Sequence, residues 1–257
     1  MKFFNFNKSK ARPQDAGQGY MSQRRHILSS KSSFHVQEAY KTLRTNIRFF
    51  LPGQGCKKFC LTSGLSGEGK SITSLNLAIS FAEAGHRVLL IDGDLRRPTL
   101  ARLLIEKATP GLSNVLAGLC SEQEAIRKEV YPNLDIMLSG ELPPNPSELL
   151  GSARMGQLIE NMSKIYDYIL VDTAPVGIVS DACVVANVLD GVLFVVHQHT
   201  AEKEFVSRGV KQLEFSGARL MGFVFNGVDP DGVRSYRNTF NRGKRSLNAD
   251  YRQEAES

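Results

Sequence analysis

Residues 57–71 read KKFCLTSGLSGEGKS, an apolar segment that runs directly into a glycine-rich turn. The last eight letters match the pattern G-x-x-x-x-G-K-[S/T] of a phosphate-binding loop. Glycines let backbone N–H groups turn inward around phosphate oxygens, and the N-terminus of a following helix adds partial positive charge. We therefore expect Lys70 to reach the β- and γ-phosphates of a nucleotide and the Ser71 hydroxyl to bind Mg²⁺.

The rest of the chain alternates between apolar runs typical of buried strands and segments with a helical period. The expected strands cover residues 57–62, 88–91, 134–138, 168–171, 192–196 and 220–225. The expected helices cover residues 34–50, 72–82, 112–128, 147–163, 181–189 and 201–216. This alternation predicts an α/β fold in which helices cover both faces of a mainly parallel sheet.

Acidic residues follow two of the expected strands. Asp172 ends the run 168–171 in the form of a Walker B motif, and Asp92 and Asp94 follow the run 88–91 in LLIDGDLRRP. The carboxyl ends of parallel strands meet at one edge of a sheet, so these acids should gather beside the phosphate loop. Asp172 is expected to hold Mg²⁺. Three acids exceed what one ATP-bound ion requires, so the surplus acid is a candidate base for a phenolic proton.

Length and composition suit one α/β domain with extensions. The chain has 257 residues and lacks any apolar run of the ~18 residues that span a bilayer. The start has no signal-peptide core, so we expect a protein that is neither secreted nor membrane-spanning by itself. We interpret the four cysteines as reduced thiols of a cytoplasmic protein; they are Cys56, Cys60, Cys120 and Cys183.

The chain is expected to divide into three parts. Residues 1–32 are expected to form a disordered basic arm, residues 33–228 the P-loop domain, and residues 229–257 a mobile tail. Residues 1–50 hold ten Lys and Arg against two acids, a net charge of +8. A solvated arm, an acidic membrane surface or partner, and nucleic acid all remain open for this charge. A solvated or partner-facing arm is favoured because no aromatic-basic platform accompanies the charge.

These motifs, taken in order, resemble the bacterial tyrosine kinase family, close to its soluble capsule and exopolysaccharide members. The resemblance covers about residues 32–228 and includes residues 67–71, 92–98, 111–113, 143–150, 172–176 and 180–182. It implies a P-loop NTPase fold of the deviant Walker type. It also implies an ATP- and Mg²⁺-dependent protein-tyrosine (auto)kinase that regulates polysaccharide synthesis or export.

The resemblance also implies roles for individual residues. Asp92 would accept the tyrosine proton, and Asp94 and Asp172 would organise Mg²⁺. Lys70 and Asp94 would join Asp92 as the catalytic set. Asn226 would lie near the adenine, although an asparagine in a buried turn is an equal alternative. The expected ATP-binding residues are Gly64, Ser66, Gly67, Glu68, Gly69, Lys70, Ser71 and Asn226.

The helix 34–50 resembles the family's ring-forming helix with its E-x-x-R-x-x-R pattern. Here the pattern is Glu38, Lys41 and Arg44, and Lys41 lacks the planar fork of Arg. An ordinary solvated helix face is the alternative. In the tail, Tyr236 and Tyr251 are candidate phosphoacceptors or simply solvated linker tyrosines.

The expected partners are other copies of the chain in a ring-like homo-oligomer, protein-tyrosine substrates, and a transmembrane adaptor. This adaptor would recruit the cytoplasmic kinase to the inner face of the cell membrane. No nucleic-acid partner is expected.

Two other functions are compatible with this scaffold. One is a nucleotide switch like the partition and septum-site ATPases, which typically carry an extra lysine beside the first glycine of the loop. Ser63, Leu65 and Ser66 surround Gly64 here, so that lysine is missing. The other is a weakly active ATP-binding assembly scaffold, which the sparse tyrosines of the tail leave open.

Overall fold

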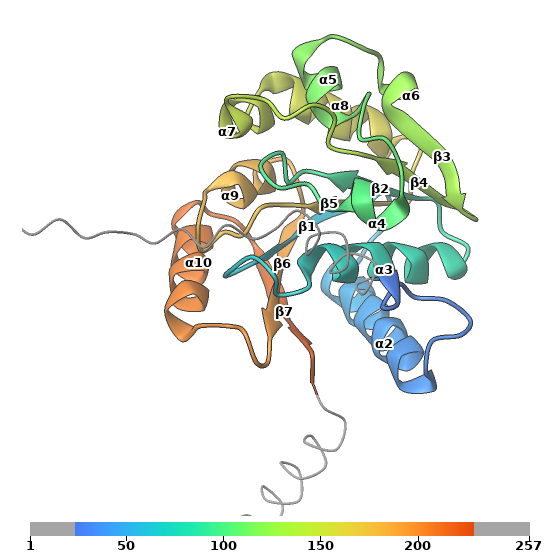
Figure 1. Ribbon diagram of the computed structural model, residues 1–257, viewed down its shortest axis with the longest axis vertical. Coiled ribbons are helices and arrows are strands. Elements are labelled where there is room, and N and C mark those ends of the chain that lie inside the picture. Colours follow the sequence, from blue (N-terminus) through green and yellow to red (C-terminus); the bar gives the residue numbers. More distant parts are fainter. Residues whose placement is uncertain (1–23, 229–257) are drawn as a thin grey trace, which may run out of the picture.

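A computed structural model describes residues 24–228, which are built around one seven-stranded sheet (Figure 1). The strands are β1 (Lys57–Ser63), β2 (Val88–Asp92), β3 (Ile126–Tyr131), β4 (Leu134–Met137), β5 (Tyr168–Asp172), β6 (Gly191–His197) and β7 (Leu220–Asn226). Their order across the sheet is β3-β4-β2-β5-β1-β6-β7. All neighbours pair in parallel except β3 with β4. The prediction of a mainly parallel α/β sheet is confirmed.

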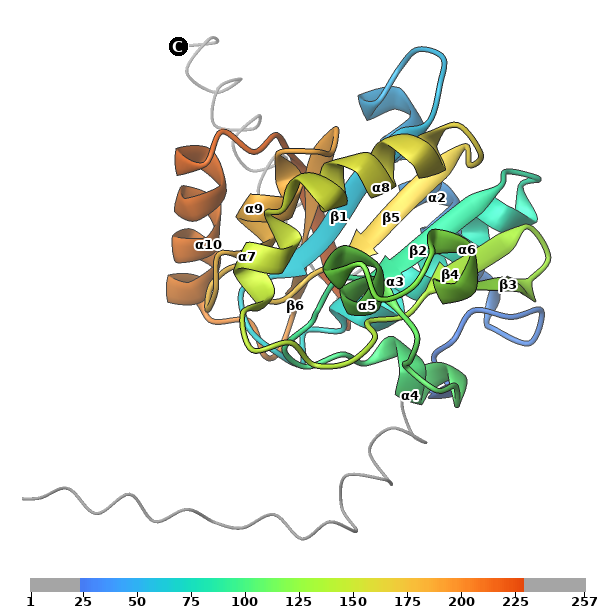
Figure 2. The same cartoon turned by 90° about the horizontal axis from the view of Figure 1, so that it is seen from above.

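Helices cover both faces of this sheet. One face carries α2 (Phe34–Phe50), α3 (Lys70–Glu83) and α4 (Leu100–Leu104). The other carries α5 (Leu112–Ala117), α6 (Glu122–Ala125), α7 (Pro146–Leu150), α8 (Ala153–Ser163), α9 (Asp181–Ala186) and α10 (Lys203–Phe215). Figure 2 shows α8 lying across β1 and β5. The apolar core is accordingly two clusters, one on each side of the sheet.

The central strands β2 and β5 are buried on both faces. Along β2, Leu89 and Ile91 pack into one cluster, whereas Val88 and Leu90 pack into the other. Burying each such side chain contributes roughly 1.5–3 kcal/mol. The two-sided burial explains why these strands read as continuous apolar runs. It also fixes where the strands end, and so where Asp92 and Asp172 lie.

The predicted helix over residues 112–128 is wrong. Helix α5 ends at Gly118, whose left-handed φ of 76° stops it, and the short α6 begins at the Ser121 cap, which Glu124 completes. The chain then enters β3, which pairs antiparallel with β4. β-branched Ile126 and Val130 suit a strand, and pairing with β4 outweighs the helical spacing.

Two smaller differences concern helices. The expected helix 147–163 is divided into α7 and α8 by Gly151 and Ser152. Helix α4 was not predicted at all, because its five residues are too few to show a period. Neither difference moves the ends of the central strands.

For residues 24–32 the expectation of disorder is wrong. Leu28 is 3% exposed and packs into the core cluster of the α3 face. Its backbone N–H donates to Asn76 Oδ1 at 2.7 Å, and Asn76 Nδ2 donates to the His26 carbonyl at 2.8 Å. Two hydrogen bonds to Asn76 and the buried side chain of Leu28 thus attach this segment to α3.

Residues 1–23 and 229–257 lie outside the described part of the chain, and with them Tyr236 and Tyr251. Across residues 24–228, every helix is too short or too polar to cross a membrane.

Candidate active site

The phosphate loop connects β1 to α3 at the carboxyl edge of the sheet. Gly67 and Gly69 adopt left-handed backbone conformations, with φ of 90° and 83°. A Cβ atom on Gly69 would lie 1.9 Å from Asn226 Nδ2, so a side chain there would be excluded by contact as well as by conformation. The first turn is held by Glu68, whose Oε2 accepts the Gly64 N–H at 2.8 Å.

Lys70 begins α3 and lies among acidic side chains. Its Nζ is 2.9 Å from Asp172 Oδ1 and 3.5 Å from Asp94 Oδ2. Burial by itself would lower the pKa of Lys70, but the Asp172 and Asp94 carboxylates outweigh it and raise that pKa. The amine is therefore a charged donor held at the edge of the sheet.

Asp92 and Asp172 end neighbouring strands at paired register positions. Both are 0% exposed. Burial and the nearby Asp172 carboxylate raise the pKa of Asp92 to about 8. Burial also raises the pKa of Asp172, against the lowering effect of Lys70. Two buried carboxylates at neighbouring strand ends repel each other, so a nearby cation is needed to stabilise the pair when both are ionised.

Hydrogen bonds orient each of the three acids. Asp92 Oδ2 accepts the Leu100 N–H at 3.2 Å, and Asp94 Oδ1 accepts the Arg97 N–H at 2.9 Å. Asp172 Oδ1 also accepts the Ser74 hydroxyl at 3.1 Å.

The residues present fit a magnesium ion. Asp92 Oδ1 and Asp172 Oδ2 are buried, and neither has a hydrogen-bond partner among the described residues. The Ser71 hydroxyl lies 3.3 Å from Lys70 Nζ and completes a set of oxygen donors. Residues 24–228 hold no group of three or more His, Cys, Asp or Glu side chains placed as a metal cage. Magnesium bound with a nucleotide needs no such cage, because it uses one or two carboxylates plus phosphates and water.

A second network holds the loop that carries Asp94. Arg96 Nε donates to Asp181 Oδ2 at 2.7 Å, and its Nη2 donates to Asp181 Oδ1 at 3.1 Å. The Ser147 hydroxyl donates to the same Oδ1 at 2.6 Å. Because Asp181 begins α9 and Ser147 lies in α7, three separate elements meet at one buried carboxylate.

Sequence reasoning missed two of these partners. Ser74 stands four residues after Lys70, so helical spacing placed it on the same face of α3. Asp181 belongs to a motif shared with the kinase family, but nothing in the sequence indicated that its partner is Arg96.

The structure brings Lys70, Ser71, Asp92, Asp94 and Asp172 to one edge of the sheet. Ser66 is exposed, whereas Glu68 and Lys70 of the same loop are buried. Asn226 Nδ2 donates to the Glu68 carbonyl at 3.1 Å and so contacts the loop itself.

The three residues of the expected ring interface engage in contacts within the chain. Arg44 donates to the backbone carbonyl of Ser80 in α3. Lys41 pairs with Glu38 at 2.8 Å, and about half of each of these two side chains is exposed.

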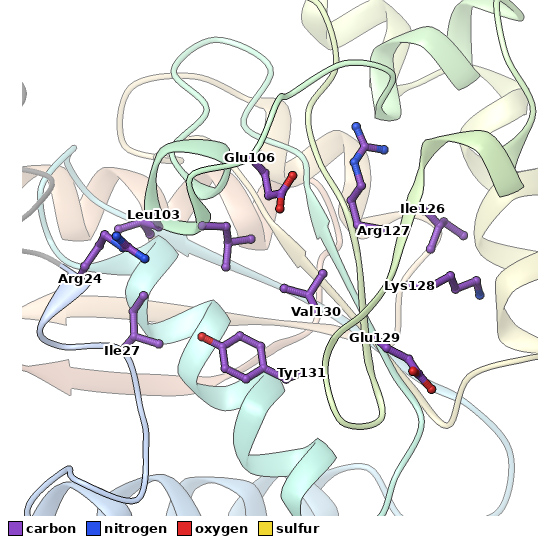
Figure 3. Close-up of a pocket in the computed structure, with 11 residues that line it drawn as sticks. Arg24, Ile27, Leu103, Glu106, Ile126, Arg127, Lys128, Glu129, Val130 and Tyr131 are labelled. Atoms are coloured by element: carbon purple, nitrogen blue, oxygen red, sulfur yellow. The ribbon is translucent and has the colours of Figure 1, made fainter.

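A groove of about 740 Å³ lies apart from this edge, between Arg24, α4 and β3 (Figure 3). Arg24, Tyr131 and Arg127 are among the residues that line it, and no predicted site residue is. We therefore assign the candidate active site from the side-chain cluster around Lys70, which the register of β2 and β5 assembles.

Comparisons with known proteins identify the family of this chain. A family model described as an AAA domain matches residues 57–214. The tyrosine-protein kinase YwqD of Bacillus subtilis is 38% identical over 209 residues, which cover 81% of this chain and 88% of that protein. The tyrosine-protein kinase CpsD of Streptococcus agalactiae is 37% identical over 211 residues, covering 82% and 91%.

Solved structures that resemble this chain also include tyrosine kinase domains. The kinase domain of the Escherichia coli tyrosine kinase ETK has a TM-score of 0.72 at 35% identity, covering 75% of this chain and 76% of that one. The septum site-determining protein MinD of Pyrococcus horikoshii, at 23% identity and a TM-score of 0.57 over 70% and 76% of the two chains, shares the fold alone. With a P-loop, a buried cluster of acids around its lysine and these relatives, the chain belongs to the bacterial family of tyrosine-protein kinases.

Proposed function

We propose that this protein transfers the γ-phosphoryl group of ATP to the hydroxyl of a protein tyrosine. One observation carries the proposal: Lys70 lies within 2.9 Å of Asp172 and 3.5 Å of Asp94, at the edge where Asp92 also ends its strand. Phosphoryl transfer depends mainly on positioning and on neutralising charge. A phosphate loop, a buried lysine and three acids supply both.

The acids would divide the work between them. Asp92 would accept the tyrosine proton in its ionised form, which Lys70 and a bound magnesium ion would favour against the burial that raises its pKa. The bond from Leu100 N–H holds its Oδ2 in place and leaves Oδ1 without a partner among the described residues. The phenol loses its proton to Asp92 as its oxygen bonds to the γ-phosphorus, and ADP leaves.

Asp94, Asp172 and Ser71 would hold Mg²⁺. When bound, the ion would neutralise charge on the phosphates. Lys70 would then meet phosphate oxygens with a charge that its acidic neighbours maintain. The Arg97 N–H fixes the orientation of the Asp94 carboxylate in this set.

The purified chain should be incubated with labelled ATP, Mg²⁺ and a tyrosine-containing peptide. Phosphotyrosine should form, and both Lys70→Met and Asp92→Asn should abolish it. Arg87→Gln is a matched control, because this side chain is largely exposed and pairs only with Asp167 within the described residues. Nucleotide hydrolysis without phosphotyrosine would instead make the chain a nucleotide switch.

We further propose that the substrate tyrosines belong to a system that makes or exports polysaccharide, as the family resemblance implies. The proposal extends to a ring-like assembly of copies, recruitment to the membrane by a transmembrane adaptor, and phosphorylation of Tyr236 and Tyr251. Mass spectrometry after incubation with ATP tests the two tyrosines. Light scattering tests the assembly, and a monomer at every protein concentration would remove the ring from the proposal.

A further inference from the structure

Glu68 lies within the phosphate loop, yet its carboxylate is bonded to the loop itself. Oε2 accepts the Gly64 N–H at 2.8 Å and the Leu65 N–H at 3.3 Å. The residue is 1% exposed, and Oε1 is buried without a hydrogen-bond partner among the described residues. Burying an acid is costly. Placing it beside a site for a polyphosphate therefore calls for a function that offsets the cost.

Asn226 holds the same residue from the other side. At the end of β7, its Nδ2 donates to the Glu68 carbonyl at 3.1 Å, and its Oδ1 accepts the Gly227 N–H at 2.9 Å. Both ends of the amide are thus used. The Nδ2 atom also lies 1.9 Å from the position that a Cβ on Gly69 would take, so the amide packs directly against the loop.

Glu68 is therefore fixed at its side chain by the start of the loop and at its main chain by the edge strand. We propose that Glu68 and Asn226 form a brace that holds the phosphate loop in its nucleotide-binding shape before the nucleotide arrives. This inference rests on the nucleotide binding in the proposed function. It assigns neither a metal contact to Glu68 nor an adenine contact to Asn226.

The physical reason for a brace is the composition of the loop. Gly64, Gly67 and Gly69 lack side chains, so an unbraced loop would sample many backbone conformations and lose that freedom on binding. Groups that restrict the loop in advance reduce this cost and raise affinity without touching the ligand. The charged acceptor also makes the two bonds to N–H groups stronger than neutral ones.

Calorimetry with three probes tests the brace: ADP in EDTA, ADP with Mg²⁺, and inorganic pyrophosphate. Glu68→Ala and Asn226→Ala should each weaken binding about tenfold. The factor should be the same for all three probes, because the loop is common to them. The double variant should lose clearly less than the ~100-fold product, because both changes loosen one loop. Glu68→Gln keeps an acceptor oxygen and should recover most of the loss.

Glu83→Ala is the matched control, since Glu83 is an exposed glutamate at the end of α3. Amide hydrogen exchange at Gly64 and Leu65, measured without nucleotide, should be faster in Glu68→Ala than in Glu83→Ala. This readout also holds if a variant is less stable, because exchange in β1 and β2 serves as the internal reference.

Three results would overturn the brace. A loss confined to the magnesium samples would make Glu68 a metal contact, and a loss confined to ADP would make Asn226 an adenine contact. If the losses of binding affinity were fully additive and amide exchange at Gly64 and Leu65 were unchanged, Glu68 and Asn226 would act independently and would not form a brace. Intact nucleotide binding without phosphotransfer would count against the kinase proposal alone.

Discussion

Asp92 and Asp172 occupy paired register positions at the ends of the adjacent parallel strands β2 and β5, and both side chains are fully buried. Each has one carboxylate oxygen without a hydrogen-bond partner among the described residues. Lys70 is a cation that already faces this pair, so the stability of the protein should depend on the protonation of the two carboxyl groups and on any further cation bound beside them.

The first prediction concerns pH and Asp92. Its folded pKa of about 8 exceeds the ordinary value of 3.8, so the folded state binds the proton more tightly than the unfolded state. The stability from this proton is complete below about pH 4 and is lost as pH rises toward 8. Asp92→Asn stays neutral, so in EDTA its free energy of unfolding should exceed that of the wild type at about pH 8.

Urea unfolding at about pH 5.5 and about pH 8 checks this prediction. The advantage of Asp92→Asn should shrink at the lower pH, where the wild-type carboxyl is also protonated. A stability difference between the two proteins that is the same at both pH values would show that Asp92 titrates normally. The variant should lose phosphotransfer at either pH.

The second prediction concerns Lys70. Lys70→Met removes the cation paired with Asp172 and Asp94, which leaves a buried carboxylate uncompensated. Breaking one partner of a buried pair costs about 3–5 kcal/mol. The lowered melting temperature should recover partly when Mg²⁺ is added, because the ion replaces the missing charge. A variant as stable as the wild type in EDTA would contradict the pairing.

The third prediction concerns the ion pair between Arg96 and Asp181. Arg96→Ala leaves the fully buried Asp181 with only the Ser147 hydroxyl as a side-chain partner within residues 24–228. The change should cost about 1–3 kcal/mol, less than breaking a fully buried pair, since Arg96 is 38% exposed. The double variant Arg96→Ala with Asp181→Asn should lose little more stability than Arg96→Ala alone, because the two side chains interact with each other. Thermal unfolding of the wild type, the two single variants and the double variant forms a double-mutant cycle. Strictly additive losses of stability would show that Arg96 and Asp181 are not coupled.

The fourth prediction concerns the segment before α2. Leu28→Ala should reduce the free energy of unfolding by about 2–4 kcal/mol, because Leu28 is 3% exposed in the core beside α3. Ser30→Ala, at a neighbouring exposed position, is the control and should have little effect. Chemical unfolding measures both, and equal stability of the two variants would show that this segment does not pack on α3.

Local sequence features predicted the strands and the phosphate loop because each depends on neighbouring residues. Continuous apolar runs at 88–91 and 168–171 are typical of strands buried on both faces, and β2 and β5 are such strands. The same logic failed for β3. Residues 126–131 have no strong alternation, and their conformation depends on pairing with β4, which follows them in the chain.

The sequence by itself determined the chemistry available at the site: a loop that can wrap phosphate, one lysine, one serine and acids directly after strands. Only the tertiary structure decided which groups act on each other. The pairing of Asp92 with Asp172, the contact of Arg96 with Asp181 and the bond from Asn226 to Glu68 join residues 80 to 158 positions apart. Such contacts arise from strand register and helix packing, which minimise the free energy of the whole chain and leave no local pattern.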